Sequence, residues 1–218
     1  KRPLPYPAAF SSRVRGSSCC LNRTIRPIPE LQMKKWEVRG TEKVFENRIF
    51  TVTSKNCFHP DKKVSWDFHV VDTFNWVNVI GLTDSDEFVL VKQHRLGTDE
   101  LSIETPGGVI EPGEEAEACA LREFTEETGY TGRSIHLLKS LQVNPAIMGN
   151  RISFYFIDGC VKSRAQKLDE AEEIEVLTVP ARELVEMVRN GVISHSIVIT
   201  GLGLYFLSEH NRFGTVTF

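Results

Sequence analysis

The segment at residues 107–132, GGVIEPGEEAEACALREFTEETGYTG, holds six glutamates within fourteen positions and a single base, Arg122. The pattern predicts one short helix that begins near Glu114 and stops before Gly129, because glycine is the usual residue just past a helix C-terminus. Three of the glutamates then project from one helix face: Glu123, Glu126 and Glu127. Like charges at these spacings destabilise a helix by about 0.2–0.5 kcal/mol per pair, so the cluster needs a physical explanation.

The opposite face of this helix is apolar and carries Ala116, Ala120 and Phe124. Such a stripe is expected to pack the helix against the rest of the protein. A solvated acidic face would usually mix charges of both signs, and this face does not. Because Mg²⁺ and Mn²⁺ prefer oxygen ligands, the cluster predicts a site for a hard cation. Arg122, four residues before Glu126, is expected to hold that carboxylate in position.

Most of the remaining sequence alternates apolar and polar residues with the period of two that is typical of strands. Strands are predicted at residues 43–52, 66–74, 76–82, 87–95, 101–106, 134–143, 151–160 and 174–180. Residues 59–63 supply a turn, and residues 83–87 supply a hairpin connection. Two more helices follow: an amphipathic one closed by Gly191, and an apolar one whose start is marked by Ser194 or Ser196. The sum is a mixed α/β domain in which strands outnumber helices.

Charge is unevenly distributed along the chain. Residues 1–32 carry six basic residues against one acidic residue, so their formal charge of +5 leaves −8 on the rest of a chain whose net charge is −3. Nucleic-acid binding needs a basic surface, and a bilayer span needs about 20 apolar residues in a row. We therefore expect neither a nucleic-acid nor a membrane partner. The five cysteines are odd in number and form no CxxC pair, which is typical of a reduced, cytoplasmic protein.

Residues 1–32 also differ from the rest in composition, with five prolines and paired serines. Arg- and Ser-rich, acid-poor segments are typical of transit peptides, which leaves organellar targeting open. A leader upstream of a natural start at Met33 is the interpretation that we favour, because MKKWEV reads like the beginning of a chain. In both interpretations this basic, Pro- and Ser-rich arm takes no part in the chemistry.

The spacing of the acidic segment matches a known motif. Gly108, five residues, Glu114, seven residues and then REFTEETGY at residues 122–130 match every fixed position of the Nudix box, nine positions over twenty-three residues. The sequence therefore resembles the Nudix hydrolase superfamily, whose members hydrolyse a nucleoside diphosphate linked to another moiety. Three further segments look like its ADP-ribose and nucleotide-sugar pyrophosphatase branch: WVNVIGL, VKQHRLGTDELSIETPGG and PAIMGNRISFYF. That branch typically has a proline about fifteen residues past the box, and Pro145 lies fifteen after Tyr130.

The resemblance implies a set of metal ligands. Glu123 and Glu127 match the ligand positions of the box, Glu126 is a third ligand, and the backbone carbonyl of Gly107 is a further one. The motif residues with an expected structural role are Gly108, Glu114, Arg122 and Gly129. The two adjacent glycines let the backbone approach the metal, because neither has a side chain. For Glu114 we favour bracing of the loop, with metal binding as the alternative.

A metal cluster still needs a group that activates or positions water. KLDEAEEIEV at residues 167–176 is a second acidic concentration, just before a predicted strand. In the resembling branch the catalytic glutamate lies in this loop, one residue before the apolar pair that leads into the strand, and that register indicates Glu172. Glu170 and Glu173 are the alternatives, and an exposed loop without a catalytic role is the other interpretation.

Three polar residues outside the box are candidates for substrate binding. Arg95 either neutralises a substrate phosphate or is a surface arginine. Glu104 either contacts the substrate or a metal-bound water, or it fixes the loop through a hydrogen bond. Arg151 either reaches a phosphate or braces the loop that carries Pro145.

Three aromatic residues are candidates for stacking on a nucleobase: Trp66, Phe68 and Trp76. Core packing is the role that we favour for each. Strand alternation does not show which face of the sheet is exposed to solvent. Trp66 is retained as the substrate-binding candidate.

The resemblance also implies a fold and an assembly. An α/β/α Nudix sandwich, with a mixed sheet between helices, is expected at residues 76–218. It is preceded by an antiparallel strand region at residues 33–75. In the resembling branch that region pairs two subunits, and each active site borrows residues from its partner. We therefore expect a homodimer.

The implied function is Mg²⁺-dependent hydrolysis of a nucleotide sugar such as ADP-ribose, giving a nucleoside monophosphate and a sugar phosphate; Mn²⁺ can replace Mg²⁺ in this scheme. The alternative within the family is another substrate, such as GDP-mannose, a dinucleoside polyphosphate or an oxidised nucleotide. A non-catalytic nucleotide-binding module is the alternative from another class. The intact acidic cluster argues against it, because a pure binder has no physical need for these repelling carboxylates.

Overall fold

The computed structural model of the chain describes residues 33–215, and the arm at residues 1–32 lies outside the described residues. The described part contains a three-stranded sheet and a seven-stranded sheet. No helix in residues 33–215 is both long enough and apolar enough to cross a bilayer.

The three-stranded N-terminal sheet is antiparallel, and its strands are β1 (Glu37–Glu46), β2 (Phe50–His59) and β3 (Val64–Thr73). The predicted turn between β2 and β3 is confirmed. The single strand predicted at residues 43–52 is wrong, because the chain reverses at Asn47. The Asn47 Oδ1 atom accepts hydrogen bonds from the backbone N atoms of Ile49 and Phe50, both at 2.8 Å. Such a local side-chain bond stabilises a turn in place of the strand ladder.

The N-terminal sheet leaves much apolar surface in contact with solvent. Every residue of β1 is exposed, and Phe45 and Trp66 are 50% and 67% exposed. Phe68 is exposed as well, and it contacts Trp36 edge-on with ring centroids 5.0 Å apart. Core packing, the role that we favoured from the sequence, is therefore wrong for Trp66 and Phe68, because strand alternation does not reveal what covers a face.

The seven-stranded sheet is mixed. Its central path runs β10-β5-β4-β9-β7, with β6 paired to β5 and β8 paired to β9. The β4–β9 pair is parallel, and the other pairs are antiparallel. The strands are β4 (Trp76–Thr83), β5 (Glu87–Arg95), β6 (Glu100–Glu104), β7 (Tyr130–Thr131), β8 (Ser134–Gln142), β9 (Arg151–Lys162) and β10 (Ile174–Pro180). All were predicted except β7, which is too short to show alternation.

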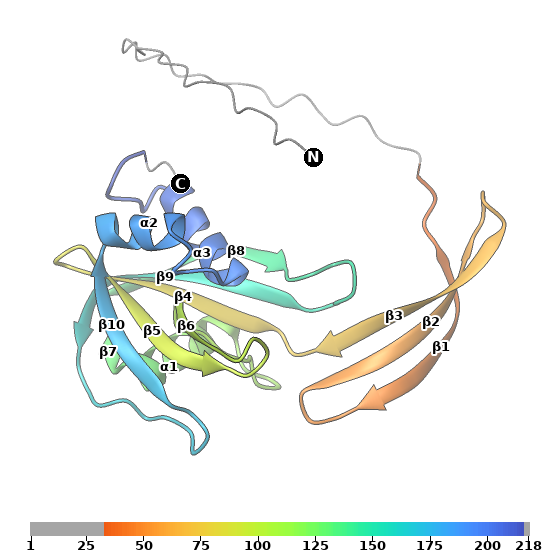
Figure 1. Cartoon of the computed structure of the whole chain (residues 1–218), viewed down its shortest axis with the longest axis horizontal. Helices are drawn as coiled ribbons and strands as arrows, with labels where there is room; N and C mark the ends of the chain where they lie inside the picture. Colours follow the sequence, from red (N-terminus) through yellow and green to blue (C-terminus); the bar gives the residue numbers. More distant parts are fainter. Residues whose placement is uncertain (1–32, 216–218) are drawn as a thin grey trace, which may run out of the picture. The chain divides into compact units, whose positions relative to one another are not determined.

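Helices cover both faces of the seven-stranded sheet, which confirms the α/β/α sandwich (Figure 1). The helices are α1 (Ala116–Thr128), α2 (Ala181–Arg189) and α3 (Ser196–Leu207). On one face, Ala120 and Phe124 of α1 are fully buried in a cluster with Val79 of β4. On the other face, Leu202 of α3 packs in a cluster with Ile80, the next residue along β4. Adjacent residues of β4 thus point into two different cores, as the pleat requires.

The C-terminal end of α1 is confirmed. Gly129 has a φ of 73°, and its N–H donates to the carbonyl of Thr125 at 2.9 Å. This left-handed conformation is easily reached only by glycine.

The helix α3 begins at Ser196, one of the two predicted positions, but the predicted serine cap is wrong. Neither Ser194 nor Ser196 caps the helix; His195 does, because its Nδ1 atom accepts a hydrogen bond from the backbone N of Ile197 at 3.2 Å. Histidine is not among the residues usually preferred at this position, so the sequence does not signal it.

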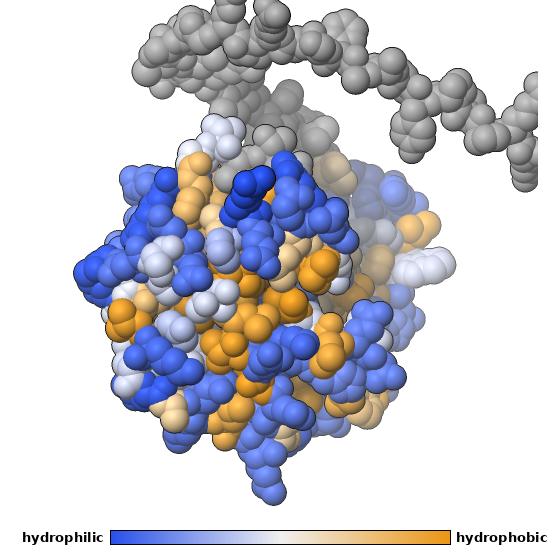
Figure 2. Space-filling view, turned by 60° about the vertical axis from the view of Figure 1, so that its left-hand side comes forward, coloured by the Kyte–Doolittle hydropathy of each residue, from blue (hydrophilic) through white to orange (hydrophobic). Residues whose placement is uncertain are grey.

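The face of the molecule turned forward in Figure 2 is hydrophilic around most of its rim, with apolar side chains grouped toward the middle. Apolar atoms make up more than half of the accessible surface of an ordinary folded protein. This grouping alone therefore does not indicate a docking site.

Candidate active site

The loop between β6 and α1 lies directly against the acidic face of α1. The backbone N of Gly107 donates to Oε2 of Glu127 at 3.0 Å. A Cβ atom on Gly108 would come within 2.3 Å of the Glu123 carboxyl group, and a Cβ atom on Gly107 would come within 2.3 Å of the Val77 carbonyl oxygen. A side chain at Gly108 would therefore meet the Glu123 carboxylate, and a side chain at Gly107 would meet the backbone of the neighbouring strand β4.

Arg122 organises one side of the acidic cluster. Its Nε and Nη2 atoms donate to the two carboxylate oxygens of Glu114 at 2.8 and 2.9 Å, and its Nη1 atom donates to Glu123 at 2.9 Å and to Glu126 at 3.3 Å. Glu114 also accepts from the backbone N of Glu111 at 3.1 Å. The Arg122 hydrogen bonds lower the pKa of Glu114 to about 2 despite partial burial. The contacts of Glu114 are those of a residue that braces the loop before α1.

Glu127 has a different environment. It is only 6% exposed, and burial raises its pKa to about 8, although the hydrogen bond from Gly107 acts in the opposite direction. Burial also raises the pKa of Glu123, against the effect of Arg122. The negative charge of Glu172 further raises the pKa of both Glu123 and Glu127. Three carboxylates from α1 and from the loop before β10 are therefore within electrostatic reach of one another.

The donor set fits a hard divalent cation, because it consists of oxygen atoms and includes a buried carboxylate that needs positive charge to ionise. Glu126 has contacts of its own, since Lys167 and Arg122 bind it at 3.2 and 3.3 Å. Among residues 33–215, no three acidic, histidine or cysteine side chains already surround a point that an ion would occupy.

Glu172 lies in the exposed loop that precedes β10. Its Oε2 atom accepts a hydrogen bond from the backbone N of Asp169 at 3.0 Å, and its own backbone N donates to the carbonyl of Asp169 at the same distance. This small turn holds the carboxylate on the loop, outside the helix that carries Glu123 and Glu127.

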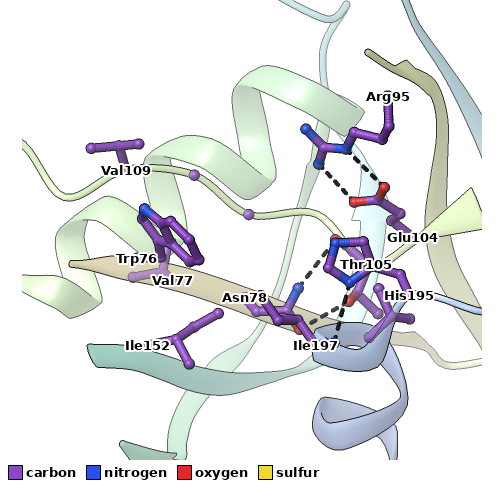
Figure 3. Close-up of a pocket in the computed structure, with 13 residues that line it drawn as sticks. Trp76, Val77, Asn78, Arg95, Glu104, Thr105, Val109, Ile152, His195 and Ile197 are labelled. Carbon is purple, nitrogen blue, oxygen red and sulfur yellow. Dashed lines mark hydrogen bonds and ion pairs between the residues drawn. The ribbon is translucent and has the colours of Figure 1, made fainter. Parts of the chain in front are cut away.

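A cavity of about 320 Å³ lies on the other side of the glycine loop. Arg95, at the end of β5, and Glu104, at the end of β6, meet at its edge through two hydrogen bonds of 2.8 and 2.7 Å (Figure 3). The Glu104 side chain is 4% exposed, whereas that of Arg95 is 46% exposed. Burial alone would raise the pKa of Glu104, but the hydrogen bonds and charge of Arg95 hold it below its ordinary value.

The structure adds residues that the sequence reasoning missed. Asn78 and Thr105 form a reciprocal buried pair, with Thr105 Oγ1 donating to Asn78 Oδ1 at 2.9 Å and Asn78 Nδ2 donating to the Thr105 carbonyl at 3.3 Å. A single polar residue in the apolar run WVNVIGL was the available signal for Asn78. His195 also lines the cavity, and its position far along the chain gave no such signal.

The remaining candidates are dispersed. Trp66 lies on exposed β3 and does not line the cavity, whereas Trp76, at the start of β4, does. Arg151 is hydrogen-bonded to Ser140 of β8, from Nε to the hydroxyl at 3.2 Å and from Nη2 to the carbonyl at 2.7 Å. Its next neighbour, Ile152, lines the cavity instead. The guanidinium of Arg151 thus links β9 to β8.

Comparison with known proteins gives both sequence and structural matches. The family model described as "NUDIX domain" matches residues 74–199. ADP-ribose pyrophosphatase from Bacillus subtilis (strain 168) is 28% identical over 150 residues, which are 68% of this chain and 80% of that protein. GDP-mannose pyrophosphatase from Salmonella typhimurium is 35% identical over 113 residues, which are 48% of this chain and 59% of that protein.

A solved structure described as "Crystal structure of ADP compounds hydrolase" superimposes with a TM-score of 0.72 at 21% sequence identity. The match covers 80% of this chain and 94% of that chain. At this level of identity the likeness establishes the fold.

Proposed function

This chain belongs to the Nudix family, as a hydrolase of the ADP-ribose pyrophosphatase type, and from this premise we propose that it cleaves the pyrophosphate bond of a nucleoside diphosphate sugar such as ADP-ribose. The products are a nucleoside monophosphate and a sugar phosphate, and the reaction depends on Mg²⁺. One observation carries the proposal: the half-buried carboxylate of Glu123 and the buried carboxylate of Glu127 meet a glycine loop that has a ligand-sized cavity on its other side.

Glu123 and Glu127 are the residues that would hold Mg²⁺, or Mn²⁺ in its place, with Glu126 and the Gly107 carbonyl as further ligands. A divalent ion supplies the positive charge that offsets the anionic oxygens of a pyrophosphate in the transition state. The chain contributes the geometry. Gly107 holds Glu127 through its backbone N–H, and Arg122 holds both Glu123 and Glu126. Loss of any of these contacts would leave the carboxylates free to separate, since they repel one another.

Glu172 is the residue that we assign to water activation. It lies on a loop, so it can approach the glutamates of α1 when substrate binds, and it already influences them electrostatically. Its carboxylate would accept a proton from the water that attacks phosphorus, a role that contributes about 10²–10⁴-fold to a rate. Glu170 and Glu173 remain the alternatives within the same loop.

Arg95 is the residue that we assign to a substrate phosphate. Its bidentate pairing with Glu104 orients the guanidinium, while its side chain keeps nearly half of its surface open to solvent. An arginine that is fixed on one side and open on the other is suited to bind an anionic oxygen. Glu104 thus positions Arg95 rather than binding the metal.

The N-terminal sheet is the surface that we assign to a homodimer contact. Its exposed aromatic and aliphatic side chains, Phe45 and Trp66 among them, are of the kind that a subunit interface buries. In such a dimer Trp66 would be available to the nucleobase bound by the partner subunit.

A panel of nucleotides tests the proposal. Phosphate release after coupling to a phosphatase is measured with ADP-ribose, GDP-mannose, a dinucleoside polyphosphate and an oxidised nucleotide, each with Mg²⁺ and with EDTA. We expect a nucleotide sugar to give the highest kcat/KM, and EDTA to abolish the activity. GDP-mannose is the second candidate, because a relative that acts on it is 35% identical over part of this chain. If the protein cleaves none of the nucleotide sugars, the proposal is wrong.

A further inference from the structure

The cavity beside the glycine loop has few polar groups that are free to contact a ligand. Asn78 and Thr105 are occupied by each other. Glu104 is bound by Arg95, and each of its carboxylate oxygens keeps a further lone pair. Apart from Arg95, which is assigned to a substrate phosphate, His195 is the remaining polar side chain in the lining, and it is the N-cap residue of α3.

The helix cap fixes the tautomer of His195. Because Nδ1 accepts the backbone N–H of Ile197, the neutral ring must carry its proton on Nε2. Within residues 33–215 this Nε2 atom forms no hydrogen bond. Figure 3 shows the ring between the Asn78–Thr105 pair and the Arg95–Glu104 pair. The cavity therefore contains an N–H donor whose direction is set by the backbone of α3.

The rest of the lining is apolar and has one aromatic wall. Trp76 is partly buried, and Val109, Ile152 and Ile197 are the aliphatic neighbours. A nucleobase is usually recognised by stacking on aromatic rings together with hydrogen bonds along its edge. A sugar ring instead presents an apolar C–H face and hydroxyl groups that both donate and accept. With Arg95 assigned to a phosphate, one aromatic wall, one further N–H donor and one carboxylate match the sugar better.

Size and position agree with this assignment. About 320 Å³ is near the lower limit of ligand pockets, which span roughly 300–1,000 Å³, so the cavity suits one ring and not a whole nucleotide sugar. Gly107 and Gly108 line it and also contact Glu127 and Glu123. A ring in the cavity is therefore next to the place where the pyrophosphate is expected.

We propose that this cavity is the subsite for the sugar ring of the sugar phosphate half of the substrate. Trp76 would pack on the C–H face of the ring, and His195 Nε2 would donate to one of its hydroxyls. The assignment rests on the proposed function for the identity of the substrate class. It makes His195 and Trp76 the residues that distinguish a nucleotide sugar from a nucleotide that lacks the sugar.

Two substitutions separate the two roles of the His195 side chain, which caps α3 through Nδ1 and donates a hydrogen bond into the cavity through Nε2. In His195→Asn the side-chain oxygen lies near the position of Nδ1 and keeps the cap, but no donor reaches the position of Nε2. In His195→Gln the amide nitrogen reaches the position of Nε2, but the cap is lost. Thermal unfolding checks the cap, and we expect only His195→Gln to lower the Tm.

The probes are the two halves of the substrate, which are not turned over. Dissociation constants for ribose 5-phosphate, mannose 1-phosphate, AMP and GMP are measured by titration calorimetry with Mg²⁺. We expect His195→Asn to weaken binding of at least one sugar phosphate by about tenfold, while His195→Gln stays within about threefold of wild type. AMP and GMP should bind all three proteins within about threefold. Trp76→Leu should weaken binding of the same sugar phosphate, and Trp36→Leu, at the residue just before β1, should not.

Each other outcome overturns the inference. If His195→Asn weakens AMP or GMP instead, the nucleoside half occupies the cavity. If wild type binds no sugar phosphate, or if His195→Asn binds it as wild type does, the cavity is not the sugar subsite. These results differ from a failure of the proposed function, in which sugar phosphates bind in a His195-dependent way but no nucleotide sugar is hydrolysed.

Discussion

The N-terminal sheet and the seven-stranded sheet are built from strands of similar alternation, yet their surroundings differ. Phe124, on the helix that covers one face of the seven-stranded sheet, is fully buried, whereas Phe45 on β1 is 50% exposed. Helices close both faces of the larger sheet, and within residues 33–215 no helix packs on the smaller one. Alternation therefore does not by itself make a core. What covers a face decides whether its apolar side chains stabilise the monomer or are available to another chain.

The largest expected effect tests this difference directly. Phe124→Ala should lower the free energy of unfolding by about 3–5 kcal/mol, because it removes a fully buried ring and leaves a cavity. Phe45→Ala should change it by no more than about 0.5 kcal/mol in the monomer. Urea denaturation at low protein concentration measures both. Equal losses for the two variants would contradict the distinction between a covered and an uncovered sheet.

The covered region also holds the proposed chemistry. Glu127→Gln should lower kcat by at least about a hundredfold, roughly 2.7 kcal/mol, because the substitution removes a charged metal ligand but keeps the size of the side chain. Without metal the stability should stay the same or rise slightly, since burial already disfavours the charged form and raises its pKa to about 8. Steady-state kinetics in saturating Mg²⁺ and urea denaturation in EDTA are the measurements.

Glu117→Gln is the matched control, because Glu117 is exposed on the same helix. It should keep kcat within about twofold of wild type, as is usual for a surface substitution. Near-wild-type turnover of Glu127→Gln would contradict the assignment of Glu127 as a metal ligand.

Substitutions in the loop before β10 should lower kcat by a similar or smaller factor than Glu127→Gln does. Glu172→Gln should lower kcat by about a hundredfold, the low end of a general-base contribution, with little change in KM or in Mg²⁺ affinity. Glu170→Gln and Glu173→Gln should each cost less than about tenfold on the same scale. A large loss at one of these two instead would shift the catalytic position within the loop. No loss at any of the three would place the base elsewhere, with Glu104 as the next candidate.

The N-terminal sheet, which no helix within residues 33–215 covers, should affect activity through dimer formation. The protein is expected to sediment near twice its chain mass of 24.7 kDa, and removal of residues 1–32 should leave both assembly and activity intact. Phe45→Asp should shift the protein toward the monomer and lower kcat/KM by about tenfold, since a buried charge is costly at an interface. Leu207→Asp, at an exposed position of α3, is the control that should leave the mass unchanged. A fully active monomer would exclude a shared site.

Local patterns were sufficient for α1 and for every strand of the seven-stranded sheet except the two-residue β7. The helix face of the glutamates follows from spacing, and the stop at Gly129 follows from the left-handed backbone that only glycine adopts easily. The errors came from side chains that compete with local propensity. Asn47 stabilises a turn within what reads as one strand, and His195 caps α3 where two serines are better candidates by type.

The amino-acid sequence by itself determined the family motif, the strand and helix types and the acidic face of α1, because each depends on spacing over a few residues. Only the tertiary structure decided which distant residues share a cavity. The side chain of Arg95 on β5 reaches Glu104 on β6, although the strand register places Arg95 opposite Glu100, and the packing of α3 brings His195 to the same cavity. It also decided that Trp66 is exposed while Trp76 lines the cavity. The physical reason is that strand order and the layers over each face are set by long-range packing, which leaves no trace in local periodicity.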